Sequence, residues 1–390
     1  MIETRFKDTD IGKIPEDWNE LPLSDVLLVG NGRDYKHLPK GNVPVYGTGG
    51  YMTSVSDFLY EGETVCIGRK GTIDKPQYHN GKIWTVDTLF YTYGFKNINV
   101  KFLYYLFCSI DWLKYNEATG VPSLTSKNIL NIKAPFPNLL EQNHIASALT
   151  SIDNLISSLD ELIEKKKNIK RGTMQQLLTG KNRLKEFIEP WYNAQLGKIG
   201  FTFNGLTGKT KEDFGKGNAK YITFLNILNN PILKPDLFEE VVIKEGERQN
   251  NCHKGDLFFN TSSETPEEVG ICAMLDSEVD SLYLNSFCFG YRLTDPNIVP
   301  EYLAYYFRSN EGRKLMTVLA QGVTRYNLSK SAFNRARILL PTSFSEQKAI
   351  VEVLMCMDNE ISALEAKKTK YVSIKQGMMQ ELLTGKIRLI

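Results

Sequence analysis

The chain contains one eleven-residue stretch twice, as MQQLLTGKNRL at residues 174–184 and as MQELLTGKIRL at residues 379–389. Sliding the chain along itself by 346 − 141 = 205 residues aligns the two copies without a gap. The match extends back to Glu141-Gln142 in the first copy and Glu346-Gln347 in the second, with about half of the aligned positions identical. Because ungapped identity over about forty residues does not arise by chance, we interpret the copies as one structural unit used twice.

Each copy is predicted to be one long helix. A short polar residue, Asn138 or Ser343, stands three positions before the glutamate of each Glu-Gln pair. This is the capping-box pattern, in which the polar side chain accepts from the first turn and the glutamate reaches back to the N–H of the cap. Thr-Gly-Lys follows each helix, so Gly180 and Gly385 are predicted to take the left-handed conformation that ends a helix.

Apolar residues recur along both copies in alternating steps of four and three, which indicates the seam of a coiled coil. They are Ile145, Leu149, Ile152, Ile156, Leu159 and Ile163, and then Ile350, Leu354, Met357, Ile361 and Leu364. Lysines 166 and 170 interrupt the first seam, and lysines 368 and 375 the second. We predict that the helices, about 60 Å long, pack antiparallel and hold a domain at each end. Packing of each helix on its own domain alone is the alternative.

The segments before the copies differ in sequence but share an order of features. Each has turn-rich strands, a late helix (residues 101–114 or 301–316) and a Gly-Val segment that leads into the long helix. We interpret them as diverged duplicates of one α+β domain. The predicted fold is therefore α+β, with two mixed domains separated by two long helices in an antiparallel coiled coil and an internal pseudo-two-fold repeat. The predicted boundaries are 1–137, 138–185, 186–342 and 343–390.

Composition limits the class of protein. A chain of 390 residues suits two or three domains, and 42% hydrophobic with 24% charged residues is typical of a soluble globular protein. The N-terminus has no signal-peptide pattern, and no apolar run approaches the roughly 20 residues of a membrane span. Six scattered cysteines indicate neither a disulfide framework nor a zinc site, so we expect a cytoplasmic protein. The net charge of +2 argues against a purely electrostatic nucleic-acid binder.

No catalytic constellation is found in the sequence. GLTGKT (residues 205–210) has two residues between its glycines where a phosphate-binding loop has four, and no clear strand precedes it. PDLFEEVVIK (residues 235–244) lacks a second patterned acid for a nuclease metal site. Cys252-His253 is interpreted as a turn, because four histidines in the chain leave few metal-ligand partners. There is neither a Pro-Pro loop of a DNA amino-methyltransferase nor a Gly-x-Ser-x-Gly elbow.

Several loops carry hydroxyl, amide and guanidinium groups, which are the groups that contact phosphates and base edges. They include a glycine-flanked GRKG turn, NGRDYKH in the first domain and GVTRYNLSK in the second. A solvated polar loop is the alternative for each. The predicted DNA-binding residues are Asn31, Arg33, Lys36, Tyr46, Arg69, Lys70, Thr125, Lys127, Thr207, Lys209, Thr210, Asn226, Thr261, Ser262, Arg325, Tyr326, Asn327 and Lys330.

Two variable domains, each followed by a long helix that opens with Glu-Gln and ends in LLTGK, resemble the DNA-specificity subunit of a Type I restriction–modification system. GKIPEDWNELPL, VPVYGTGGY, IGRKGTI and the proline-rich APFPNLLEQ and LLPTSFSEQ add to the resemblance. It covers essentially the whole chain, and the repeated helix is its most specific part. One departure is that the second proline-rich segment has one more residue between proline and Glu-Gln than the first.

The resemblance implies that each domain reads one half of a bipartite sequence in double-stranded DNA, while the paired helices set the spacer. It implies as partners two modification subunits, which carry S-adenosylmethionine, and restriction subunits that use ATP and Mg²⁺. It implies no cofactor, no catalysis and no membrane association for this chain. The alternatives are a self-contained restriction or methylation enzyme and a coiled-coil adaptor.

Overall fold

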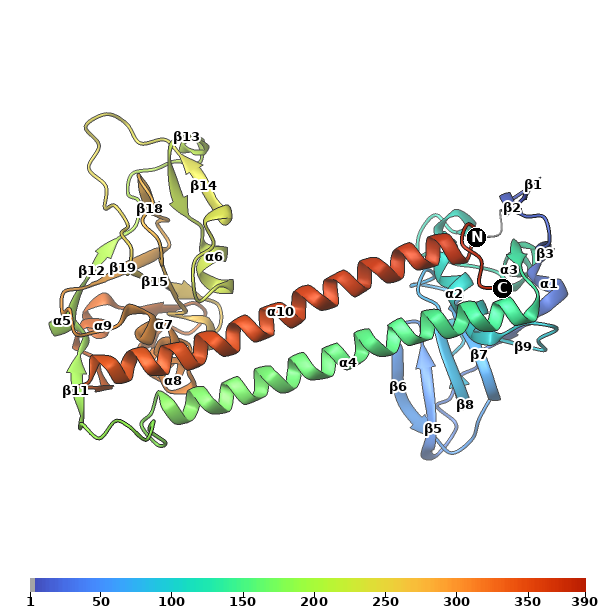
Figure 1. Ribbon diagram of the computed structural model, residues 1–390, viewed down its shortest axis with the longest axis horizontal. Coiled ribbons are helices and arrows are strands. Elements are labelled where there is room, and N and C mark those ends of the chain that lie inside the picture. Colours follow the sequence, from blue (N-terminus) through green and yellow to red (C-terminus); the bar gives the residue numbers. More distant parts are fainter. Residues whose placement is uncertain (1–3) are drawn as a thin grey trace. The chain divides into compact units, whose positions relative to one another are not determined.

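The computed structural model describes residues 4–390, which form two compact units. Unit 1 comprises the chain up to Glu161 together with Glu365–Ile390, and unit 2 comprises Leu162–Leu364. Two unbroken helices of 39 residues each belong partly to both units, α4 (Leu139–Leu177) and α10 (Phe344–Leu382) (Figure 1). Both helices lie inside the predicted segments 138–185 and 343–390. Each unit thus contains one of the two variable domains and a part of each long helix.

Unit 1 is built on a six-stranded sheet. In spatial order its strands are β4 (Leu28–Asn31), β9 (Leu89–Tyr93), β7 (Tyr60–Gly68), β8 (Gln77–Thr85), β5 (Lys40–Gly47) and β6 (Gly50–Val55). Neighbouring strands are antiparallel except for β8 and β5. The other elements are the strand pairs β1 (Phe6–Thr9) with β2 (Gly12–Pro15) and β3 (Asn19–Pro22) with β10 (Lys133–Phe136), and the helices α1 (Leu23–Val26), α2 (Val100–Ser109) and α3 (Ser126–Asn131).

Unit 2 divides its strands among smaller sheets. Its four-stranded sheet runs β12 (Gly200–Asn204), β19 (Cys288–Leu293), β15 (Leu257–Asn260) and β17 (Cys272–Met274). Two three-stranded sheets run β14 (Phe238–Val241), β13 (Phe214–Ile222), β18 (Leu282–Leu284), and β16 (Ser262–Ser263), β21 (Tyr326–Leu328), β20 (Ala320–Gln321). The last pair is β11 (Trp191–Gln195) with β22 (Arg337–Pro341), and the helices are α5 (Leu196–Ile199), α6 (Phe224–Asn229), α7 (Pro300–Arg308), α8 (Asn310–Leu319) and α9 (Lys330–Arg335).

The two units repeat one topology. The three strands β4, β9 and β7 of unit 1 correspond in order and pairing to β12, β19 and β15 of unit 2. The antiparallel pair that precedes the long helix is β3 with β10 in unit 1 and β11 with β22 in unit 2. This correspondence confirms that the domains are diverged duplicates of one α+β domain.

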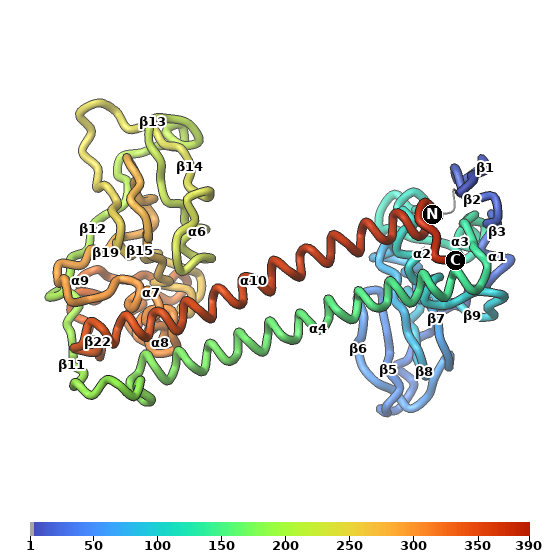
Figure 2. Tube along the Cα trace, in the orientation of Figure 1, coloured from blue at the N-terminus to red at the C-terminus, as the bar shows by residue number. Residues whose placement is uncertain are grey.

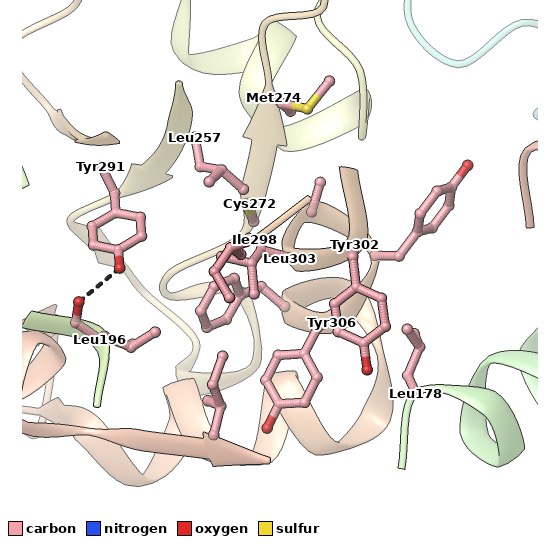
Figure 3. Close-up of a cluster of buried hydrophobic side chains, with 14 of the residues drawn as sticks. Leu178, Leu196, Leu257, Cys272, Met274, Tyr291, Ile298, Tyr302, Leu303 and Tyr306 are labelled. Carbon is pink, nitrogen blue, oxygen red and sulfur yellow. Dashed lines mark hydrogen bonds between the residues drawn. The ribbon is translucent and has the colours of Figure 1, made fainter. Parts of the chain in front are cut away.

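The core of unit 2 brings the sheet, α7 and the end of α4 together. Figure 3 shows Leu257, Met274 and Tyr302 in this cluster with Leu178, which lies just beyond α4. The Tyr291 hydroxyl donates to the Leu196 carbonyl at 2.7 Å, so a large buried aromatic keeps its polar atom paired. The core of unit 1 likewise includes residues of both long helices, namely Ile145 and Leu149 of α4 and Leu382 of α10. Each long helix therefore packs on the domain cores.

The helices also pair with each other, and the pairing is antiparallel in each unit. In unit 2, Lys166 of α4 pairs with Glu360 of α10, and Lys170 pairs with Asp358. In unit 1, Asp160 pairs with Lys368 and Asp153 with Lys375. Residue numbers rise along α4 as they fall along α10, which confirms the antiparallel coiled coil (Figure 2). Each of the four lysines that interrupt the apolar seam thus forms an ion pair with an acidic residue of the other long helix.

The helix ends confirm the predicted caps in part. Asn138 accepts from the N–H of Glu141 at 3.0 Å, and Ser343 accepts from the N–H of Glu346 at 3.3 Å. Gly180 and Gly385 have φ of 69° and 70°, as a left-handed helix stop requires. The reciprocal half of the capping box was a wrong prediction, because both glutamate side chains turn to partners far away in the sequence.

Those partners form what we call the helix-end clamps. In unit 1, Glu141 accepts from Arg388 Nε at 2.7 Å and from Trp18 Nε1 at 3.0 Å. In unit 2, Glu346 accepts from Arg183 Nε at 2.8 Å and from Trp191 at 3.3 Å. Both glutamates are at most 1% exposed. Each clamp thus joins the start of one long helix to the segment that follows the other, which explains why both Glu and the arginine after Thr-Gly-Lys are repeated.

The glutamine of each Glu-Gln pair fastens the start of the long helix to its domain. Gln142 accepts from the N–H of Asn99, the N-cap of α2, at 2.9 Å, and Gln347 accepts from the N–H of Val299, the N-cap of α7, at the same distance. Their amide groups donate to the carbonyls of Pro137 and Pro341. Every side-chain oxygen and nitrogen of the repeated Glu-Gln dipeptide is therefore hydrogen-bonded, so the dipeptide has a structural role.

Two local predictions need correction. The helix expected over 301–316 breaks at Ser309, whose hydroxyl caps α8 by accepting from the Gly312 N–H at 3.3 Å. The helix expected over 101–114 ends at Ser109 and is followed by a 3-10 helix at Trp112–Tyr115. Over residues 4–390, no helix is both long and apolar enough to cross a membrane.

Candidate nucleic-acid interface

In unit 1 the structure brings the GRKG turn to the Gly-Val segment. Strand β7 ends at Gly68, and the carbonyl of the next residue, Arg69, accepts from the Leu124 N–H at 2.9 Å. Lys70 forms an isolated β-bridge with Ser123. A Cβ on Gly68 would stand 2.1 Å from the Thr72 carbonyl oxygen, so glycine is required for this close turn. The side chains of Arg69 and Lys70 are exposed.

Three of the predicted stretches in unit 1 converge on the end of β8 and its connection to β9, residues 85–88. Arg33 donates its N–H to the Thr85 carbonyl at 2.8 Å, and Arg69 donates to the Thr88 carbonyl at 2.7 Å. Between them, the Val86 N–H donates to the Tyr46 carbonyl at 3.0 Å. Asn31, at the end of β4, and Lys36 are both exposed nearby in the same chain segment as Arg33. Separate stretches therefore meet through backbone hydrogen bonds at this connection, and the side chains of Arg33 and Arg69 are exposed beside it.

Tyr46 is held by its neighbours rather than free to move. Its ring stacks on His79 at a centroid distance of 3.8 Å and meets Tyr51 edge-on at 6.3 Å. Burial lowers the pKa of His79 to about 4, so this imidazole is neutral at pH 7. Tyr51 and Met52, just past the turn from β5 into β6, are 64% and 52% exposed. The sequence analysis did not select these two residues, although Tyr51 ends the quoted VPVYGTGGY stretch and Met52 follows it.

Unit 2 has the same turn with different side chains. Strand β15 ends at Asn260, and the carbonyl of the next residue, Thr261, accepts from the Leu328 N–H at 2.8 Å. Ser262 pairs with Asn327 as Lys70 does with Ser123. Leu124 and Leu328 are both buried, at 2% and 5% exposed. Arg69 and Thr261 are thus equivalent positions, and so are Lys70 and Ser262.

The residues after these leucines cap the next helix in each unit. Thr125 accepts from the Asn128 N–H at the start of α3, and Ser329 accepts from the Ala332 N–H at the start of α9. The Thr125 hydroxyl is therefore already engaged in a structural role, while Lys127 on α3 is exposed. The same kind of cap therefore follows the equivalent leucines in both units.

Exposed apolar residues accompany the turn of unit 2. Phe287 is 65% exposed, and its carbonyl accepts from both the N–H and the hydroxyl of Thr261. Val323, between β20 and β21, is 92% exposed and precedes the exposed Arg325 by two residues. Tyr326 is half-buried, and Asn327 is exposed. Only the exposure of Phe287 and Val323 identifies them, because an apolar letter in a sequence does not reveal whether it is buried.

Lys330 is less accessible than the sequence suggests. Its ammonium group donates to the Asn204 side chain of β12, and burial lowers the pKa of Lys330. It ties the start of α9 to the sheet. Of the predicted set around Leu328, Arg325 and Asn327 present the most accessible polar groups.

Four other predicted residues of unit 2 are engaged inside the unit. The Lys209 ammonium donates to the Val242 carbonyl and to Glu247, each at 2.6 Å, and its side chain is 4% exposed. This bond lowers the pKa of Glu247 to about 2. Thr210 caps a 3-10 helix, Asn226 is 1% exposed and bonded to Lys234, and Thr207 bonds Gln249 through its backbone. The polar groups of Lys209, Thr210 and Asn226 thus have partners inside the unit, and contact of these residues with DNA stays a prediction.

The GLTGKT segment follows strand β12, so the expectation that no strand precedes it was wrong. Its exclusion as a phosphate loop rests on firmer ground, since Glu247 neutralises the lysine that would hold a phosphate. The Cys252–His253 turn is closed by the Asp256 N–H, which donates to the His253 carbonyl. Within residues 4–390 there is no cluster of three or more His, Cys, Asp or Glu side chains arranged to hold a metal.

Comparison with known proteins agrees with this arrangement. The sequence profile of the Type I restriction modification DNA specificity domain matches residues 15–171 and again residues 188–373. The specificity subunit of the type I restriction enzyme MjaVIII from Methanocaldococcus jannaschii is 22% identical over 435 aligned residues, covering 99% of this chain and 96% of that protein.

Solved structures share the fold. The S subunit of the Type I restriction–modification system from M. genitalium superposes with a TM-score of 0.61 at 13% identity, covering 94% of this chain and 96% of that one. A chain from a structure of complex assembly and conformational transition of the type I R-M system superposes with a TM-score of 0.57 at 15% identity. The match covers 96% of this chain and 100% of that one. With two profile matches over most of its length, the chain belongs to the Type I restriction–modification DNA-specificity family and carries that family's domain twice.

Proposed function

We propose that this chain is the subunit that selects the DNA sequence for a Type I restriction–modification complex, with one half-site read by the domain of each unit. The observation that carries the proposal is the pair of equivalent turns. Leu124 holds Arg69 as Leu328 holds Thr261, through one backbone bond, while the exposed side chains differ. A constant frame with variable polar side chains is what reading two different half-sites requires.

The long helices would set the distance between the half-sites. Half-sites read from one side of DNA lie about 34 Å apart or at a multiple of that distance. A helix of 39 residues is about 58 Å long, which is the right scale for such a spacer. Pairing would stiffen the helices, since within each unit cross-helix ion pairs and the domain core involve both of them.

Chemistry would reside in partner subunits. We infer that two modification subunits supply S-adenosylmethionine and methylate adenine, and that restriction subunits supply the ATP- and Mg²⁺-dependent steps. This assignment is supported by the relative that is named a specificity subunit. It is also supported by the similarity in fold to a chain from a structure of type I R-M complex assembly. The six free thiols fit the reducing cytoplasm that we propose as the site of action.

Charge bears on how the chain holds DNA. Segment 1–137 has 15 basic and 15 acidic residues, and segment 186–342 has 17 and 19, so their net charges are 15 − 15 = 0 and 17 − 19 = −2. Because phosphate contacts need a basic surface, partner subunits would supply most of the affinity. We expect weak binding by the isolated chain and tight binding by its complex. Nanomolar binding of the isolated chain to its site at physiological salt, seen in a gel-shift assay, would contradict this.

The central experiment is co-expression with the cognate modification subunit and genome-wide mapping of methylated adenines. The expected result is one bipartite sequence with a fixed spacer. Replacing residues 186–342 by the matching segment of a relative should change one half-site and leave the other. A coiled-coil adaptor would leave the methylated sequence unchanged, and a self-contained enzyme would modify or cut DNA alone when given S-adenosylmethionine or Mg²⁺.

A further inference from the structure

In unit 1, a tyrosine, an aspartate and a lysine from three different helices meet at one point. The Tyr105 hydroxyl of α2 donates to Asp153 Oδ2 of α4 at 2.8 Å. Lys375 of α10 lies 2.6 Å from the other carboxylate oxygen of Asp153. The same ammonium nitrogen stands 5.5 Å from the centroid of the Tyr105 ring. A helix of the domain and both long helices are thus joined through one carboxylate.

Unit 2 contains the same cluster with the long helices exchanged. The Tyr305 hydroxyl of α7 donates to Asp358 Oδ2 of α10 at 2.8 Å, and Lys170 of α4 pairs with the other oxygen of Asp358. Lys170 Nζ stands 5.4 Å from the Tyr305 ring centroid. We call the two clusters the three-helix joints. Neither tyrosine belongs to the repeated helix, yet each domain places one at the same point.

Because the charged groups of the joints are partly buried, loss of either partner is energetically costly. The lysine side chains are 17% and 23% exposed and the aspartates 32% and 33%, whereas the other two cross-helix pairs, Lys166–Glu360 and Lys368–Asp160, are 32–51% exposed. A half-buried charge without its partner is costly, and a cation over an aromatic face is stabilised further. Burial, together with the hydrogen bond to Asp153, raises the pKa of Tyr105, so its hydroxyl stays a donor.

An apolar heptad seam does not by itself choose one register, because a slip of a heptad again places apolar residues opposite each other. Buried polar residues are a known means of choosing register in coiled coils. Here the step from Asp153 to Lys170 along α4 equals the step from Asp358 to Lys375 along α10. One antiparallel register therefore satisfies both joints, and any slip would separate each lysine from the aspartate that its domain's tyrosine contacts.

We infer that the two three-helix joints, Tyr105–Asp153–Lys375 and Tyr305–Asp358–Lys170, hold each recognition domain to a single register of the helix pair and so determine how strictly the protein selects spacer length. The inference rests on the proposed function. These residues position the reading surfaces and do not contact DNA themselves. Each joint contributes through the domain helix it adds, α2 or α7, to the two long helices.

The test uses the full complex with the modification subunit and duplexes that carry the mapped site with its natural spacer, or a spacer one base pair shorter or longer. The test variant is Lys170→Met with Lys375→Met, and the matched control is Lys166→Met with Lys368→Met. Both variants remove two seam lysines. The control pairs are more exposed, and they are not part of a three-helix joint.

The wild-type complex should methylate the natural spacer at least about tenfold faster than either altered spacer, a difference of about 1.4 kcal/mol. In Lys170→Met/Lys375→Met this preference should fall to about threefold or less. The control variant should keep the wild-type preference. Restoring opposite charges by exchanging all four residues, with Asp153→Lys, Lys375→Asp, Asp358→Lys and Lys170→Asp together, should recover part of it.

Tyr105→Phe with Tyr305→Phe, which removes only two hydroxyls, carries the test if the lysine variant does not fold. An unchanged spacer preference in a folded joint variant overturns the inference, as does an equal loss in the control. A wild-type complex with no preference for any site or spacer overturns the proposed function instead, which keeps the two failures apart.

Discussion

The helix-end clamps and the candidate reading turns are both present twice, but only the clamps keep their side chains. Glu141 with Arg388 and Glu346 with Arg183 are the same ion pair in the two units. The turns keep one backbone hydrogen bond, to Arg69 or to Thr261, and exchange everything that is exposed. A backbone bond tolerates any side chain at its residue, whereas a buried ion pair tolerates the loss of neither partner. The molecule can therefore vary what it reads without disturbing how its domains are mounted.

The largest expected effect breaks a clamp. Arg388→Met leaves Glu141, which is 1% exposed, without its cation, and should lower the free energy of unfolding by about 4 kcal/mol. Arg183→Met does the same to Glu346 and should cost a similar amount. Urea unfolding of both variants measures this, with the exposed Arg325→Met as control. A large effect in only one unit would show that the two clamps are not equivalent.

The next effect sharpens the comparison of the two helix stops. Alanine at Gly180 or Gly385 is strained by φ near 70°, at about 1 kcal/mol. At Gly385 the added Cβ would also stand 2.3 Å from Pro15 Cγ, whereas at Gly180 its nearest neighbour is Trp191 at 3.4 Å. Gly385→Ala should therefore lower the unfolding free energy by about 3 kcal/mol, more than Gly180→Ala. Equal shifts in thermal midpoint would contradict the different packing of the two stops.

The turns give an effect on specificity rather than stability. Arg69→Ala should relax selection at one base pair of one half-site by about 2 kcal/mol, with the other half-site unchanged. Thr261→Arg should add a preference in the opposite half-site, because the two positions are equivalent. Methylome mapping of both variants checks this, with Lys254→Ala, an exposed cation elsewhere in unit 2, as control. If Arg69→Ala changes neither the selected bases nor the salt dependence of binding, this residue is not a DNA contact.

The smallest effect is a difference in acid sensitivity. His79 has a folded pKa of about 4 against 6.5 when unfolded, so the unfolded chain binds the extra proton first. Stability from this residue is full above pH 6.5 and falls as the pH drops toward 4, by about 1 kcal/mol once solvent screening is allowed for. His79→Phe should flatten this part of the unfolding curve while keeping the stack on Tyr46. An unchanged slope between pH 6.5 and 4 would argue against the buried, neutral imidazole.

Much of the architecture follows from local signals. The repeated helix, its polar N-caps at Asn138 and Ser343, its glycine stops and the antiparallel seam are all confirmed. The break at Ser309 was not predicted, because a serine within a helical pattern is common and only its cap on α8 reveals the interruption. In the candidate interface, the GRKG turn and the Gly-Val segment were each chosen from composition, and the structure places them side by side.

The sequence does not reveal which side chains of the candidate interface are already paired and which are exposed. Lys209 and Asn226 look like free polar groups in the sequence, yet one is neutralised by Glu247 and the other is bonded to Lys234. Exposed Phe287 was missed for the opposite reason, because an apolar residue is expected inside. DNA contacts by all of the predicted residues stay predictions.

By itself the sequence determined the duplication, the extent of the long helices and the places where they begin and end, because periodicity, caps and glycine act over a few residues. Only the tertiary structure decided which partner each charged side chain has. Glu141 looked like a local cap and became a clamp with Arg388, and the lysines that seemed to weaken the seam became its cross-helix pairs. A charged side chain pairs with whichever opposite charge the fold places close to it, and the neighbouring residues in the sequence do not determine which one that is.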